Sequence, residues 1–173
     1  MRHFLIHKYD FAQGDIESEW TSLCDLLRET GQLYPPPFYL QLEREFLDVV
    51  VQFLRKYDLL TLQYRFCYLI DDDLIHTEPS GWLQSLILPL EHTVGLVEEK
   101  GFQALSYLER LAVFQLAIRG AVNVAIEDDS TGVTLSTVDD GFYWYITLRD
   151  CDRPEELVTS PRLFIDESIN IFD

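Results

Sequence analysis

Three short runs of carboxylates are the residues of this sequence best placed to do chemistry. They occupy residues 71–73, 127–129 and 139–140, where predicted strands end. Clustered carboxylates can hold a hard cation such as Ca²⁺ or Mg²⁺, or present an acidic surface to a basic protein. The metal interpretation is weak, because the run from Asp128 lacks the alternating ligands and distal glutamate of an EF-hand loop. Two interpretations stay open: ordinary solvated turn residues and a surface for a basic partner.

The aromatic run Phe142-Tyr143-Trp144-Tyr145 lies directly after the last of these acids. Successive side chains of a strand point to opposite faces, so Phe142 and Trp144 share one face and the two tyrosines share the other. One face is expected to enter the core. The other is either covered by helices or exposed beside the acids, where tyrosine is a common interface anchor. The predicted partner-binding residues are Asp71, Asp72, Asp73, Glu127, Asp128, Asp129, Asp139, Asp140, Tyr143 and Tyr145.

The remaining residues form no recognised catalytic pattern. His3 and His7 are four residues apart and would bind zinc together with Asp10, but two histidines without an HExxH pattern or a cysteine pair are weak evidence for a metal site. The sequence has no GxSxG, GxGxxG or P-loop motif. Paired carboxylates of a small hydrolase stay open, because a chain rich in Asp and Glu always offers such pairs. We expect no catalytic residue, no metal and no cofactor.

The net charge of the chain indicates the sign of the charge that its partner carries. Its 173 residues include 30 acidic and 13 basic side chains, a net charge of -17. Residues 120–173 carry -9 of this total, more than half of the charge in under a third of the length. Proteins bind nucleic acids and anionic membranes mainly through Lys and Arg, and acids outnumber these residues here. We therefore expect neither a nucleic acid nor a membrane as a partner. A strong negative field instead speeds encounter with a cationic protein.

Hydrophobic periodicity predicts helices interleaved with strands. Helices are predicted where apolar residues recur every three or four positions, at 15–30, 37–56 and 106–119. Strands are predicted where apolar residues alternate, at 2–9, 60–70, 122–126, 133–138 and 142–148, with a last short strand within 163–171. Asp139-Asp140-Gly141 between two of these strands favours a tight hairpin. This order predicts an α+β fold with helices packed on one face of a mainly antiparallel sheet and a C-terminal meander.

Two of the predicted helices have clear start signals. Pro37 suits the first turn of a helix, where its missing N–H would be unbonded, and Ser106 with Glu109 forms a capping box. Within the helix that follows Pro37, Glu43 is expected away from the core-facing stripe. That stripe is expected to consist of Phe38, Leu42, Phe46, Val49, Val50 and Phe53.

Length and cysteine usage predict a single domain, 1–173, that works in the cytoplasm. The first fifteen residues lack the hydrophobic stretch of a secretory signal. Three cysteines form neither an even disulfide set nor a CxxC pair, which suits a reducing compartment.

In size, acidity and lack of catalytic motifs the chain resembles bacterial immunity proteins as a class. That resemblance implies a cytoplasmic inhibitor that binds a basic toxin, most simply a nuclease whose phosphate-binding cleft attracts carboxylates. The alternatives are a DNA mimic or adaptor that occupies a nucleic-acid-binding protein, and the small hydrolase. We therefore predict a non-enzymatic binding protein with a basic protein partner.

Overall fold

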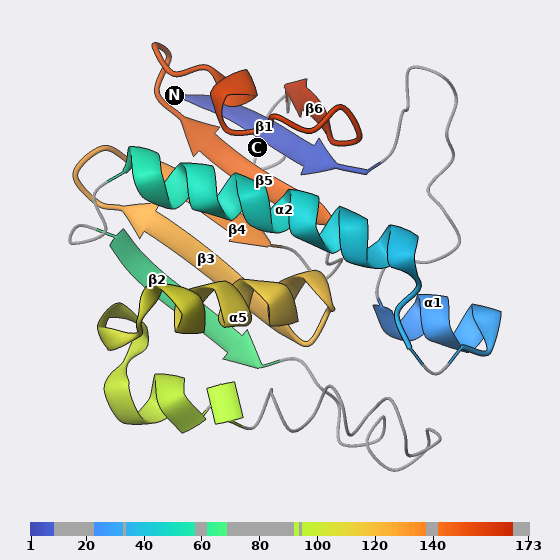
Figure 1. Ribbon diagram of the computed structural model, residues 1–173. Coiled ribbons are helices and arrows are strands. Elements are labelled where there is room, and N and C mark those ends of the chain that lie inside the picture. The colour runs from blue at the N-terminus through green and yellow to red at the C-terminus, as the bar shows by residue number, and fades with distance from the viewer. Residues whose placement is uncertain are drawn as a thin grey trace.

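The computed structural model describes residues 1–8, 23–32, 34–57, 62–68, 92–93, 95–137 and 142–167, with the backbone alone at 24, 25, 28 and 62–68. These residues form an α+β fold in which helices cover one face of a six-stranded antiparallel sheet (Figure 1). The strands are β1 (Arg2–His7), β2 (Leu62–Tyr68), β3 (Val122–Asp128), β4 (Val133–Thr137), β5 (Tyr143–Leu148) and β6 (Phe164–Glu167). The helices are α1 (Leu23–Thr30), α2 (Pro37–Lys56) and α5 (Tyr107–Ile118), with short 3-10 turns η2 (Phe102–Ala104) and η3 (Pro154–Glu156).

The sheet has the strand order β2-β3-β4-β5-β1-β6, and every neighbouring pair is antiparallel. Strands β3, β4 and β5 follow one another as the predicted meander, which is confirmed. The N-terminal strand β1 then lies between β5 and the last strand β6, as Figure 1 shows. The two ends of the described chain are therefore joined within one sheet.

Alternation along the strands separates a helix-covered face from an opposite face. Val122, Val124 and Ile126 of β3 are buried, while the residues between them are half-buried. In β5, Trp144 is buried under α2 and α5, where its ring lies 5.3 Å from that of Phe46 and 6.0 Å from that of Phe114. The prediction that one face of the aromatic run enters the core is confirmed.

Helix α2 begins at Pro37 and ends at Lys56, as predicted, but its buried stripe differs from the expectation. Phe38 is 52% exposed, whereas Tyr39 is buried, and its ring lies edge-on to the ring of Phe142. Glu43, expected on another face, is only 4% exposed. The reason is that Tyr39, Glu43 and Phe46 follow one another at spacings of four and three and so share the face that packs on α5 and the sheet.

Helix α5 confirms its capping box. The backbone N–H of Ser106 donates to Glu109 at 2.6 Å, and the backbone N–H of Glu109 donates to the Ser106 hydroxyl at 3.3 Å. Among the described helices, none is both long enough and apolar enough to cross a membrane.

Candidate interaction surface

The face of the sheet opposite the helices is the first candidate surface. None of the described helices covers it (Figure 1). We call it the open face. Its described side chains in β1, β3, β4 and β5 are His3, Leu5, Asn123, Ala125, Glu127, Thr134, Ser136, Tyr143, Tyr145 and Thr147. His7 shares this side of β1 but is buried.

The centre of the open face is a cross-strand row around Tyr145. Its Cα partner in β1 is Leu5, and its partner in β4 is Ser136. In the neighbouring row, Thr147 pairs with His3, and the Thr147 hydroxyl lies 3.1 Å from Nδ1 of His3. Side chains that pair in this way share one face of a sheet and contact each other. The two rows therefore place an aromatic ring beside hydroxyls and an imidazole on a shared surface.

His7 is held apart from any shared metal site with His3. The two residues lie four positions apart on one strand, roughly 13 Å at the usual rise. The His7 ring lies between the rings of Tyr143 and Phe164, and its Nε2 is 2.8 Å from Oδ2 of Asp166. Asp10 lies outside the described residues. Within the described part of the chain, no group of three His, Cys, Asp or Glu side chains is placed to hold a metal ion.

Five of the predicted partner-binding residues lie in the described part of β3, its following turn and β5. Glu127, Tyr143 and Tyr145 are half-buried and belong to the open face. Asp129 is exposed in the turn after β3. The structure thus places both predicted tyrosines and one acid on the same face of the sheet. Glu127 lies in the row of Thr134 and Thr147, one row from Tyr145 and two rows from Tyr143.

Asp128, the fifth of these predicted residues, stabilises the turn that follows β3. Its carboxylate is buried and accepts hydrogen bonds from Ser130 N and Oγ, at 3.0 and 2.7 Å, and from Thr131 Oγ1 at 2.7 Å. The turn closes at Gly132, whose φ of 71° is a conformation that glycine adopts without strain. We leave Asp128 out of the partner surface for this reason.

The other predicted acids, Asp71, Asp72, Asp73, Asp139 and Asp140, lie outside the described residues. Thr137 and Phe142, which flank residues 138–141, lie at the opposite end of the β4–β5 pair from the turn after Asp128. Cys67 belongs to β2, whose side chains are not described. Cys151 is a free, exposed thiol.

Two acids that sequence reasoning missed are buried in ion pairs. Glu43 accepts hydrogen bonds from Arg119 at 2.6 and 3.1 Å and from Gln115 at 2.6 Å. Burial acts to lower the pKa of Arg119, but the hydrogen bonds and charge of Glu43 outweigh it and hold that pKa above its ordinary value. The missed signal was the position of Glu43 between Tyr39 and Phe46 on one helical face.

The second buried acid, Asp152, fixes the turn after β5 to the end of α2. It accepts from Arg149 at 2.8 and 3.1 Å and from the Tyr57 hydroxyl at 3.2 Å, and Lys56 Nζ lies 3.3 Å away. The hydrogen bonds from Arg149 lower the pKa of Asp152 to about 2. Burial opposes this shift, and the Lys56 cation reinforces it. Asp152 is therefore a structural acid.

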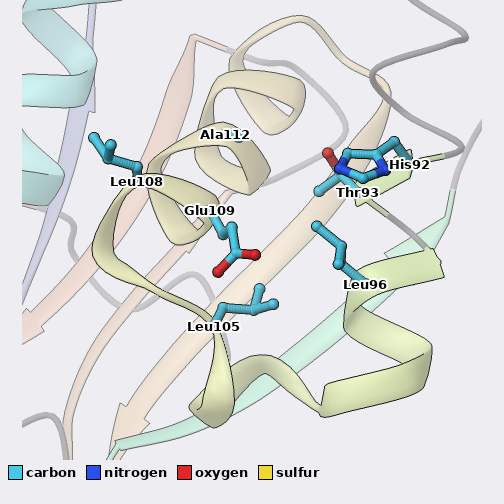
Figure 2. A pocket seen from close by; sticks show the side chains of 7 residues that line it. All are labelled: His92, Thr93, Leu96, Leu105, Leu108, Glu109 and Ala112. Atoms are coloured by element: carbon cyan, nitrogen blue, oxygen red, sulfur yellow. The ribbon is translucent and has the colours of Figure 1, made fainter.

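A pocket beside the first turns of α5 is the second candidate (Figure 2). We call it the α5 pocket. Figure 2 shows residues from α5 and its preceding loop on one side and His92, Thr93 and Leu96 on the other. Its volume is about 240 Å³, and its lining residues are His92, Thr93, Leu96, Leu105, Leu108, Glu109 and Ala112.

The one carboxylate in this lining is already engaged. Hydrogen bonding to the side chain and backbone N–H of Ser106 lowers the pKa of Glu109 to about 2, and Lys100 Nζ lies 3.4 Å from its other oxygen. A general acid at neutral pH needs the opposite shift, toward a raised pKa. The position of Glu109 is explained by its role in the helix cap.

Comparisons with known proteins leave function to be inferred from charge and geometry. No family model, no characterised protein and no solved structure matches the chain. The open face offers aromatic, hydroxyl and carboxylate groups for contact, and the α5 pocket offers an apolar hollow. Both arrangements suit recognition of another macromolecule.

Proposed function

We propose that this protein binds a basic protein and neutralises it, as a cytoplasmic immunity protein does for a nuclease toxin. The observation that carries the proposal is the open face, where Tyr143 and Tyr145 lie with Glu127 in a chain of net charge -17. Aromatic side chains are the commonest anchors of protein interfaces. We propose that Glu127, together with the acids at 71–73, 129 and 139–140, matches the positive cleft that a nuclease uses to bind phosphate.

The distribution of charge supports a partner of this sign. Of the 30 acids and 13 bases, 16 acids and 11 bases have described side chains, a net of -5. The remaining excess falls in the other segments, which include the predicted acids at 71–73 and 139–140. These acids stay in the proposal as part of the surface that the partner meets.

In β2, which pairs with β3, the one base is Arg65. Arg65 has Ala125 as its Cα partner, two positions from Glu127 on β3. The described side chains of β1, β3, β4 and β5 on this face include one acid and no Lys or Arg. We therefore propose that the contact is centred on Tyr145 and Leu5, on the side away from β2.

The mechanism divides between encounter and retention. The negative field speeds the approach of a cationic protein and fades with added salt. Once the proteins meet, Tyr143 and Tyr145 bury apolar area and slow dissociation. Carboxylates in the nuclease cleft would then exclude the phosphates of its substrate.

The test is capture followed by a nuclease assay. The tagged full-length protein is exposed to lysate of its own cells at low salt, and bound proteins are eluted by raising the salt and identified. We expect a basic protein whose purified form cleaves nucleic acid and loses this activity when one equivalent of the protein is added. The double variant Tyr143→Ser, Tyr145→Ser should neutralise the nuclease poorly. The matched control, Tyr34→Ser, changes an exposed tyrosine elsewhere and should neutralise it normally.

Other outcomes point to other functions. A captured nucleic-acid-binding protein that has no nuclease activity would favour the DNA-mimic or adaptor alternative. A neutral or acidic partner, or a nuclease that stays active at excess inhibitor, would contradict the proposal.

A further inference from the structure

We infer that the α5 pocket receives one large apolar side chain from a basic segment of the partner. This inference rests on the proposed function and adds a second contact, on the helix-covered side of the molecule. It names what the partner must carry there: a leucine, phenylalanine or tryptophan with lysine or arginine beside it.

The lining of the α5 pocket is mainly apolar and partly open to solvent. Leu96, Leu105, Leu108 and Ala112 supply four of its seven residues. Leu108 is 75% exposed, and Tyr107 beside it is 42% exposed. Large apolar side chains exposed next to a hollow gain from being covered. The first turn of α5 therefore presents an apolar contact point that the fold itself does not bury.

The size of the pocket favours a side chain over a separate small molecule. Small-molecule sites usually begin at about 300 Å³, and this pocket has a volume of about 240 Å³. Interfaces commonly place an aromatic or aliphatic anchor from one protein into a hollow of this kind on the other. A single anchoring residue is the occupant that fits.

The charge beside the pocket selects a basic partner. Glu98 and Glu99 are exposed on the helical residues 95–100, which supply Leu96 to the lining, and neither forms an ion pair with a described residue. Of the two cations near the pocket, Lys100 is paired with Glu109, and Arg110 donates a hydrogen bond to the backbone carbonyl of Gln103. A second copy of this chain is a poor occupant, because two molecules of charge -17 repel each other. Lysine or arginine beside the anchor would instead meet Glu98 and Glu99, which are exposed and pair with no cation among the described residues.

The test uses the full-length protein with isotope-labelled methyl groups and the blocked peptide Lys-Lys-Trp-Lys-Lys as the probe. We expect peptide-induced NMR shifts at the methyls of Leu96, Leu105 and Leu108. Ala112→Leu should fill the pocket and weaken peptide binding about tenfold. Leu40→Ser, which changes an exposed leucine on α2, is the matched control and should bind the peptide normally.

Charge is tested in the same titration. Glu98→Gln with Glu99→Gln should weaken peptide binding, and the peptides Lys-Lys-Ala-Lys-Lys and Glu-Glu-Trp-Glu-Glu should produce no shifts at these methyls. Shifts spread over the whole chain, or shifts that persist in Ala112→Leu, would overturn the inference. Concentration-dependent shifts of Leu108 without peptide would also overturn it, since a second copy would then cover the pocket.

Failure here is separable from failure of the proposed function. If Ala112→Leu neutralises the captured nuclease as well as the unmodified protein does, the inference is wrong and the proposed function stands. If neutralisation weakens about tenfold in Ala112→Leu but not in Leu40→Ser, the inference is supported. A captured partner that is neutral or acidic contradicts both.

Discussion

Glutamate has opposite roles in two regions of the molecule. One region is the junction between α2 and α5, and the other is the helical stretch 95–100. At the junction, Glu43 is buried and accepts three hydrogen bonds from Arg119 and Gln115. On residues 95–100, Glu98 and Glu99 are exposed and pair with no described cation. Burial decides the difference, because a buried carboxylate requires partners and an exposed one is satisfied by water.

This difference shows which part of the charge is available to a partner. The net charge of -17 counts every carboxylate equally. Glu43, Asp128 and Asp152 are buried and bonded within the fold, so they hold the structure together. The exposed acids contribute little to stability and are the ones able to steer a cationic protein. Neutralising the two kinds of acid should therefore have separate effects.

The largest expected effect follows from breaking the junction. Glu43→Ala leaves the Arg119 cation buried without its partner and should lower the free energy of unfolding by about 3–5 kcal/mol. Urea denaturation measures this loss, and Glu99→Ala on the exposed helix should change stability by less than about 0.5 kcal/mol. The double variant Glu43→Leu, Arg119→Met should be more stable than Glu43→Leu alone. A loss below about 1 kcal/mol in Glu43→Ala would show that the junction is not a structural ion pair.

The next effect is a pH dependence at Asp152. Its pKa is about 2 in the folded protein against an ordinary 3.8, so the unfolded chain takes up this proton first as the pH falls. The stabilisation is complete above about pH 4 and is lost as the pH falls toward 2. Asp152→Asn should cost about 2 kcal/mol at neutral pH and remove this part of the pH dependence. If the two proteins differ in free energy of unfolding by the same amount at every pH, the assignment to Asp152 is wrong.

A smaller effect is expected at the cap of α5. Ser106→Ala removes one half of the capping box and should lower stability by about 1 kcal/mol. The same change should raise the pKa of Glu109 from about 2 toward its ordinary value, because Ser106 is the main cause of the lowering. NMR titration of the Glu109 carboxyl group checks this, and an unchanged pKa would mean that another group holds the carboxylate.

The elements that local patterns define were predictable from the sequence. Pro37 marked the start of α2, Ser106 with Glu109 marked the start of α5, and alternating apolar residues marked the meander. Each of these signals lies within a few neighbouring residues. The placement of β1 between β5 and β6 was not predictable, because the pairing of Arg2 with Leu148 joins residues far apart in the chain.

The candidate surfaces were predictable only in part. Alternation correctly separated Trp144 from Tyr143 and Tyr145, so the aromatic part of the open face followed from one strand. The burial of Glu43 depends on Arg119, 76 positions away. The α5 pocket is assembled from His92, Thr93 and Leu96, the loop at Leu105 and α5, which no local pattern brings together.

If the negative charge of the chain drives recognition, the rate of association with the captured partner must depend on salt. Stopped-flow tryptophan fluorescence gives the association rate constant at increasing NaCl concentration for the unmodified protein and for a variant with Glu127→Gln, Asp129→Asn, Asp139→Asn and Asp140→Asn. We expect an association rate constant that falls at least about tenfold between low and physiological ionic strength, with a shallower fall in the variant. A rate that is the same at every salt concentration and in both proteins would contradict this expectation.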